Sequence, residues 1–318
     1  MPVKSANHGL YHANPKNQTI ANAEYCYFSG NPEGSCRAIE NLIHDDDLTI
    51  RLSACLLYAY ANLPLGNTNR TKYVLTELNN ALTTISGTPS SRTQAAMAFV
   101  GYASSTLLHI PLPKNPPYKQ VSSSSSPRSQ RVCPLCICTS PLSEGRLCSK
   151  PRNRRSNASF NPKTLPIPEI YLHMVAVMDC MSLKYTDNAQ THLLAAWDIA
   201  RPDGLIEAFG EHHGLLGGML ESVIKKNWPD DFKRIIDITY RFSAGWRQIH
   251  NPATEETVAD NLTTTEFSIS MLAARGWTNQ EIGKHLGISA STVKSYLTAS
   301  FRKLGISKRQ ELSKFMLK

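Results

Sequence analysis

A polar row near the C-terminus holds the side chains with the clearest capacity for chemistry. Its spacing places the members on one side of a helix of 3.6 residues per turn, opposite an apolar side. The polar members are Lys294, Ser295, Thr298 and Arg302, and the apolar members are Val293, Leu297, Phe301 and Leu304. Two cations beside two hydroxyls provide hydrogen-bond donors and acceptors together, a combination suited to contacts with a polyanion.

A second group with chemical potential is the cysteine cluster Cys133, Cys136, Cys138 and Cys148. Four thiolates could hold a tetrahedral zinc ion. Their spacing matches no known zinc module, and the surrounding Ser, Pro and Arg residues offer nothing to orient the ligands. We therefore predict no metal site, with zinc binding by these cysteines as the weaker alternative.

Charge is distributed unevenly along the 318 residues, whose formal net charge is +9. Residues 261–318 contain nine Lys/Arg and three Asp/Glu, and residues 111–164 contain ten Lys/Arg and one Glu. The rest of the chain is therefore net acidic. A basic segment can be the electrostatic footprint of a polyanion such as a nucleic acid, but many basic runs are only solvated surface, and charge alone leaves both interpretations open.

Several function classes find no support in the sequence. The first thirty residues lack the apolar core of a signal peptide, and the most apolar runs are too short for a bilayer. We therefore predict a cytoplasmic protein with no membrane partner. No phosphate-binding Gly-x-x-x-x-Gly-Lys-Ser/Thr loop, aspartate-bearing receiver domain or nucleophile–base–acid set is recognisable. The chain is not expected to be an enzyme or to need a cofactor.

Helical periodicity dominates the body of the chain. Apolar residues recur at intervals of three and four in the stretches 52–63, 74–85, 170–181, 193–200 and 215–224. Helix pairs separated by short polar turns are typical of tetratricopeptide-like repeats. No clean 34-residue period is visible, however, and a generic helical bundle explains the pattern equally well. The fold class is predicted to be all-α.

Composition divides the chain into six segments. A flexible tail rich in Asn, Pro and Gly is expected first, then a helical body interrupted by a basic Ser/Pro/Cys-rich insertion, and then a polar tether before a last domain. The predicted bounds are 1–34 for the tail, 35–110 and 165–250 for the two parts of the body, 111–164 for the insertion, 251–260 for the tether and 261–318 for the last domain.

The last domain carries strong signals for helix boundaries. A Ser or Thr followed three positions later by Glu or Gln has the spacing of a capping box, and a glycine after an apolar stripe can end a helix in the left-handed conformation. The predicted boxes are Thr263 with Glu266, Thr278 with Glu281, and Ser307 with Gln310, and Ser289 is a further N-cap. The terminating glycines are Gly276, Gly287 and Gly305.

These signals predict four short helices around one small core. The helices are expected at 263–275, 279–286, 290–304 and 308–317. The core is predicted to consist of Ile269, Leu272, Ile282, Leu286, Ile288, Val293, Leu297, Phe301, Leu304, Leu312 and Phe315.

The same segment resembles the LuxR-type (GerE-like) helix-turn-helix DNA-binding domain. The resemblance runs from Leu262 to Leu312 without a gap and includes Asn-x-Glu-Ile at 279–282 and Ser-x-x-Thr-Val-Lys at 289–294. Departures from the family pattern stand at Thr265, Ser268 and Ser270, where Arg, Glu and an apolar residue are usual. These departures weaken the first helix but leave the turn and the second helix of the motif intact.

The resemblance implies that helix 290–304 enters the major groove of double-stranded DNA. Lys294, Ser295 and Thr298 would then occupy the positions that face base edges. Phosphate contacts would come from Thr292, Tyr296, Arg302 and Lys303. The residues that would hold the motif together are Thr278, Glu281, Ile282, Leu286, Ile288, Val293, Leu297 and Leu304.

Residues 193–224 are more loosely similar to the helical domain of MalT-type LuxR regulators. Together the two resemblances imply a sequence-specific transcription regulator that binds DNA as a homodimer, with a body that senses a small-molecule or protein effector. One alternative is a helical scaffold whose DNA binding is vestigial. The other is a metal-dependent protein organised by the cysteine cluster.

Overall fold

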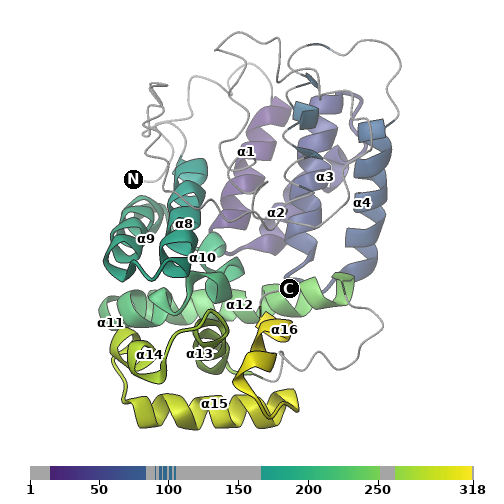
Figure 1. Cartoon of the computed structure of the whole chain (residues 1–318). Coiled ribbons are helices and arrows are strands. Elements are labelled where there is room, and N and C mark those ends of the chain that lie inside the picture. Colours follow the sequence, from purple (N-terminus) through teal and green to yellow (C-terminus); the bar gives the residue numbers. More distant parts are fainter. Residues whose placement is uncertain are drawn as a thin grey trace. The chain divides into compact units, whose positions relative to one another are not determined.

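A computed structural model of the chain is entirely helical in the parts that it describes (Figure 1). The described residues are 15–83, a few positions between 90 and 104, 166–250 and 262–316. The absence of strands from these ranges confirms the predicted all-α class. The predicted insertion 111–164 and tether 251–260 lie outside the described residues.

The chain divides into two compact units, and the first comprises residues up to 172 together with 199–205. Its described helices include α2 (Pro32–Ile39), the short 3-10 turn Glu40–Leu42, α3 (Leu48–Asn62) and α4 (Thr68–Thr83). Helices α3 and α4 pack against each other through their apolar stripes, and Leu52, Leu57, Val74 and Leu78 are buried. The helical periodicity predicted for these stretches is confirmed.

Residues 15–34 are not the flexible tail that the sequence predicted. They form α1 (Pro15–Phe28) and the beginning of α2, where the Asn31 side chain caps the helix by accepting from the Gly34 amide at 2.9 Å. The buried residues of α1 are Ile20, Ala23 and Tyr27. This stripe has helical spacing but is so narrow that the surrounding Asn and Gln residues concealed it.

The second unit comprises residues 173–198 together with 206–318. Its body contains parts of α8 (Pro166–Ser182) and α9 (Thr186–Ala200), followed by α10 (Glu207–Glu211), α11 (Lys225–Asn227) and α12 (Pro229–His250). The ring of Trp197 is fully buried and lies 5.3 Å from that of Phe209 and 5.6 Å from that of Trp228, between ring centroids. This aromatic cluster forms the centre of the body's core.

The stretch between α10 and α11 is not the regular helix that the apolar stripe 215–224 predicted. It consists of a 3-10 turn, His213–Leu216, and a π-helical turn, Leu220–Ile224. Gly217 and Gly218 separate the two turns with φ angles of 59° and 76°. Two consecutive left-handed residues cannot continue an α-helix, so they divide the stripe.

The last part of the second unit contains α13 (Thr264–Ala274), α14 (Asn279–Leu286) and α15 (Ala290–Leu304), which lie together in Figure 1. Their bounds agree with the predicted helices to within one residue. The fourth predicted helix is instead a 3-10 turn, Arg309–Leu312, followed by the single turn α16 (Ser313–Met316). None of the described helices is long and apolar enough to span a membrane.

The helix starts show which of the predicted caps form. The capping boxes of Thr263 with Glu266 and of Thr278 with Glu281 are both confirmed, with reciprocal bonds of 2.6–3.2 Å. The box predicted for Ser307 with Gln310 is wrong. The carboxylate of Glu311 instead accepts from the amides of Ser307 and Lys308, one residue later than expected.

Candidate nucleic-acid interface

Helices α14 and α15 are joined by a short turn whose geometry follows from its glycines. Gly287 ends α14 with a φ of 70°, and Ser289 begins α15 by accepting from the Thr292 amide at 3.0 Å. The Ile288 amide donates back to the Gly283 carbonyl at 2.9 Å. A Cβ at Gly283 would lie 2.6 Å from the Ile288 carbonyl oxygen, so only glycine lets the turn pack against α14.

A small apolar core fixes α15 against α13 and α14. Most of the predicted members are buried: Ile269, Leu272, Ile282, Val293, Leu297, Leu304 and Leu312. Leu286, Ile288 and Phe301 are half-buried at its margin. The prediction that Phe315 belongs to this core is wrong, because 37% of this residue is exposed, whereas the next residue, Met316, is buried. This core packs α15 against α13 and α14.

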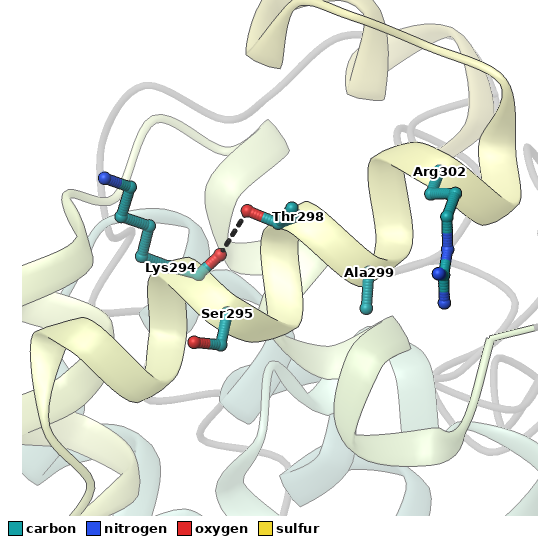
Figure 2. Close-up of a pocket in the computed structure, with 5 residues that line it drawn as sticks. All are labelled: Lys294, Ser295, Thr298, Ala299 and Arg302. Atoms are coloured by element: carbon teal, nitrogen blue, oxygen red, sulfur yellow. Dashed lines mark hydrogen bonds between the residues drawn. The ribbon is translucent and has the colours of Figure 1, made fainter.

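The side of α15 that faces away from this core carries a shallow hollow. It is lined by Lys294, Ser295, Thr298, Ala299 and Arg302, and we name these five residues the outer face (Figure 2). All except the half-buried Ala299 are exposed. Neither Lys294 nor Arg302 has an ion pair within the described part of the chain. The structure therefore brings together four predicted site residues, and it adds Ala299, which the sequence analysis overlooked because its side chain has no polar atom.

The two hydroxyls of the outer face are hydrogen-bonded to the helix itself. The Thr298 hydroxyl donates to the Lys294 carbonyl at 2.9 Å, which is the dashed line in Figure 2. The Ser295 hydroxyl donates to the Ser291 carbonyl at 3.1 Å. Both oxygens are thus held in defined positions on the exposed side.

The predicted phosphate contacts fall into different environments. Thr292 is exposed beside Ser289 at the start of α15, and Tyr296 is half-buried. Arg302 is exposed on the outer face. Lys303 lies apart from these, because its ammonium forms a 2.7 Å ion pair with Glu266 of α13.

The pair of Lys303 and Glu266 ties α15 to α13. The Glu266 carboxylate is only 7% exposed and also accepts from the Thr263 amide. Burial opposes ionisation, but the hydrogen bonds from Lys303 and Thr263 together hold the pKa of Glu266 below its ordinary value. The charge of Lys303 is therefore engaged within the domain.

Arg309 is a structural residue whose role the sequence analysis missed. Its guanidinium donates to the Asn279 side chain at 2.8 Å and to the backbone carbonyls of Trp277 and Ala273. It thereby connects the 3-10 turn Arg309–Leu312 to the start of α14. The signal available in the sequence was Asn279 at a helix start, but its partner lies 30 residues away.

A second face of the same three-helix assembly contacts the body of its own unit. We name Phe267, Ser268, Glu281 and His285, on α13 and α14, the docking face. The Ser268 hydroxyl donates to Glu221 at 3.1 Å, and His213 donates to the same carboxylate at 2.8 Å. Burial opposes ionisation of Glu221, but His213 and Ser268 hold its pKa below the ordinary value.

Further contacts extend the docking face. Lys184, in the left-handed conformation with a φ of 63°, donates to both carboxylate oxygens of Glu281 at 3.0 and 3.1 Å. His285 donates to the Gly217 carbonyl at 3.0 Å, and burial lowers the pKa of this imidazole. The ring of Phe267 packs against Gly214, and a Cβ at this position would clash with the ring.

The predicted cysteine cluster, Cys133, Cys136, Cys138 and Cys148, lies outside the described residues. Within the described residues, no group of three or more His, Cys, Asp or Glu side chains could hold a metal ion.

Two helices packed at a short turn, the second with an exposed row of polar and cationic side chains, define a helix-turn-helix domain. Residues 260–316 match the family of bacterial regulatory proteins of the luxR type. This segment is therefore a LuxR-family DNA-binding domain, as its sequence resemblance implied. No curated protein and no solved structure matches the chain. The similarity of residues 193–224 to MalT-type regulators lies outside the matched segment and stays a prediction.

Proposed function

We propose that this chain is a sequence-specific transcription regulator that inserts α15 into the major groove of DNA. The outer face is the observation that carries this proposal. It offers two cations that are free of ion pairs within the described residues, beside two hydroxyls, on a helix fixed by its core. A major groove admits one α-helix, and its base edges present the acceptors and donors that such side chains recognise.

The proposed contacts divide by chemistry. Lys294, Ser295 and Thr298 face the bases, because they lie on the outer face near the start of α15. Thr292, Tyr296 and Arg302 contact phosphates and fix the position of the helix on the duplex. Lys303 contributes little to phosphate binding, because its positive charge is already paired with the carboxylate of Glu266.

We further propose that two copies of the chain bind paired half-sites. The outer face consists of only five side chains and can distinguish few base pairs. A short site recurs often by chance in a genome, so two recognition helices are needed for useful selectivity. In this proposal the body supplies the contacts between copies and responds to a small-molecule or protein effector in the cytoplasm.

The matched substitutions Lys294→Ala and Lys226→Ala test the proposal in the full-length chain. Both remove one exposed lysine, but Lys226 lies on α11, outside the helix-turn-helix domain. Lys294→Ala should weaken binding to the preferred site by about 1–3 kcal/mol and relax the preference at one base position. Lys226→Ala should change neither.

The measurement is a binding titration against the preferred site and against competitor DNA, repeated at several salt concentrations. Unchanged affinity of Lys294→Ala for its site would show that α15 is not the recognition helix. Equal affinity of the wild-type chain for all sequences would favour a helical scaffold whose DNA binding is vestigial. Neither result depends on knowing the effector.

A further inference from the structure

We infer that the outer face reads DNA through two hydroxyl oxygens acting as acceptors and through one methyl group, so that its site presents exocyclic amino groups and a thymine. This inference rests on the proposed function, since it specifies which base edges α15 selects. The residues concerned are Ser295, Thr298 and Ala299.

The polarity of the hydroxyls follows from their hydrogen bonds. Each hydroxyl has one proton, and in Ser295 and Thr298 that proton is directed to a backbone carbonyl of α15. Donation to a base would require breaking this bond, whereas acceptance requires no change. The lone pairs that remain on each oxygen therefore favour a donor on the DNA.

Only two major-groove groups can donate to these oxygens. They are the N6 amino group of adenine and the N4 amino group of cytosine. Guanine presents two acceptors there, and thymine presents one acceptor and a methyl group. Fixed acceptors on α15 thus select adenine or cytosine on the contacted strand and disfavour guanine and thymine.

Ala299 supplies the apolar contact. It lies one helical turn after Ser295 and between Ser295 and Arg302 along the hollow, and in Figure 2 these three side chains point to the same side of α15. Ala299 has no hydrogen-bonding atom in its side chain, so a polar base edge placed against it would lose a partner. The thymine methyl group is the one major-groove feature that an alanine side chain matches.

The remaining base-facing donor is Lys294. In Figure 2 its ammonium extends away from Ala299, on the side of α15 that carries Thr298. An ammonium can only donate, and guanine offers the N7 and O6 acceptors. The expected half-site therefore combines a guanine with amino-bearing bases and a thymine methyl group within the few base pairs that α15 spans.

The test begins by selecting the preferred site of the full-length chain from random duplexes. Each adenine of that site is then replaced in turn by 2-aminopurine, and each cytosine by 2-pyrimidinone, which removes the amino group from the major groove. At the position that Thr298 contacts, the wild-type affinity should fall about two- to tenfold, the range for one hydrogen bond. The identity of the sensitive base distinguishes adenine from cytosine.

Thr298→Val is the matched variant, because valine keeps the shape and one methyl group but removes the oxygen. It should bind the unmodified site as weakly as the wild type binds the modified one, and it should no longer respond to loss of the amino group. Ser295→Ala should behave in the same way at a second position. Circular dichroism of both variants should be unchanged, since both side chains are exposed.

A parallel series replaces each thymine by uracil, which removes only the methyl group. One position should lose about fourfold in affinity, the effect of burying one carbon, and Ala299→Gly should abolish that loss. If the wild-type chain selects no preferred sequence from the random duplexes, the proposed function itself is overturned. Specific binding that is insensitive to every amino deletion, or equally sensitive in Thr298→Val, would overturn this inference alone.

Discussion

The outer face of α15 and the docking face of α13 and α14 belong to one small domain, but their polar side chains differ in whether they have partners within the protein. On the docking face each named polar side chain has a protein partner: Ser268 on Glu221, Glu281 on Lys184 and His285 on Gly217. On the outer face Lys294 and Arg302 have no ion pair within the described residues.

The comparison distinguishes polar side chains that stabilise the packing of the unit from polar side chains that can bind a ligand. Buried polar groups require partners, and the docking face meets this requirement within its own unit. Exposed cations are hydrated and can exchange that hydration for phosphate or base contacts. The departure of Ser268 from the family's usual glutamate is informative here, because its hydroxyl reaches Glu221 of the body.

The strongest way to break the docking face is to remove Glu221. The side chain of Glu221 is 9% exposed and that of its partner His213 is 2% exposed. Removal of the carboxylate therefore leaves the buried imidazole of His213 without its hydrogen-bond acceptor. Glu221→Ala should therefore destabilise the second unit by about 3–5 kcal/mol, because His213 and Ser268 each lose a hydrogen bond to a carboxylate, worth roughly 1.5–3 kcal/mol. Urea unfolding followed by tryptophan fluorescence measures this, since all four tryptophans lie within that unit's residues. A cost below about 1 kcal/mol would mean that the carboxylate is dispensable to the packing.

Lys303→Met tests the pair that ties α15 to α13. Methionine keeps most of the aliphatic stem, but the carboxylate of Glu266 loses its 2.7 Å partner. The expected loss of unfolding free energy is about 2 kcal/mol, because a charged hydrogen bond to a buried group is lost. The salt dependence of DNA binding should remain close to that of the wild type. A clear change in that dependence with no loss of stability would instead make Lys303 a direct phosphate contact.

Arg302→Ala, at the neighbouring residue, tests a contact with DNA that does not contribute to the stability of the domain. Arg302 is exposed on the outer face, so its removal should leave the stability within about 0.5 kcal/mol. The slope of log affinity against log salt should become shallower by about 0.9, the effect of one phosphate contact. The two substitutions are at neighbouring positions but should have opposite effects. Lys303→Met should lower the stability and leave the salt dependence of DNA binding unchanged, whereas Arg302→Ala should reduce the salt dependence and leave the stability unchanged. An unaltered slope in Arg302→Ala would place this residue outside the DNA contact.

The smallest expected effect concerns Glu281, which is part of the docking face and of the α14 cap. The Thr278 amide, and after it Lys184, lower the pKa of Glu281 from 4.5 to about 2. A lowered pKa stabilises the folded state above pH 4.5, and this contribution is lost as the pH falls toward 2. The melting temperatures of the wild type and of Glu281→Gln should therefore differ most above pH 4.5 and converge near pH 2. A difference that stays constant over this range would show that the charge contributes nothing.

Local signals in the sequence were sufficient for the helix-turn-helix domain. Thr263, Thr278 and Ser289 define their helix starts through bonds to residues three positions away, and such short-range contacts can be read from spacing alone. The polar row of α15 followed from the same periodicity. The failed prediction at Ser307 shows the limit, since Glu311 offered a competing acceptor to the same turn.

Contacts between distant residues could not be predicted in this way. Lys184 and Glu281 are 97 residues apart, and Glu221 and Ser268 are 47 apart, so no spacing rule connects them. The narrow stripe of α1 was missed because three buried residues do not outweigh a polar composition. Ala299 was missed for a different reason, because its part in the site comes from shape and not from a functional group.

Gly283 has a consequence for how the gene for this protein can vary. Every single-nucleotide missense change in a glycine codon encodes a residue with a Cβ, and at this position a Cβ would meet the Ile288 carbonyl oxygen at 2.6 Å. Gly287, where nothing lies within 4 Å of such a Cβ, is restricted by its φ of 70° alone, a conformation that aspartate occasionally adopts and that one change in a glycine codon can encode. In a library of coding variants selected for DNA binding, codon 283 should therefore tolerate no missense substitution, while codon 287 should retain a small set of survivors.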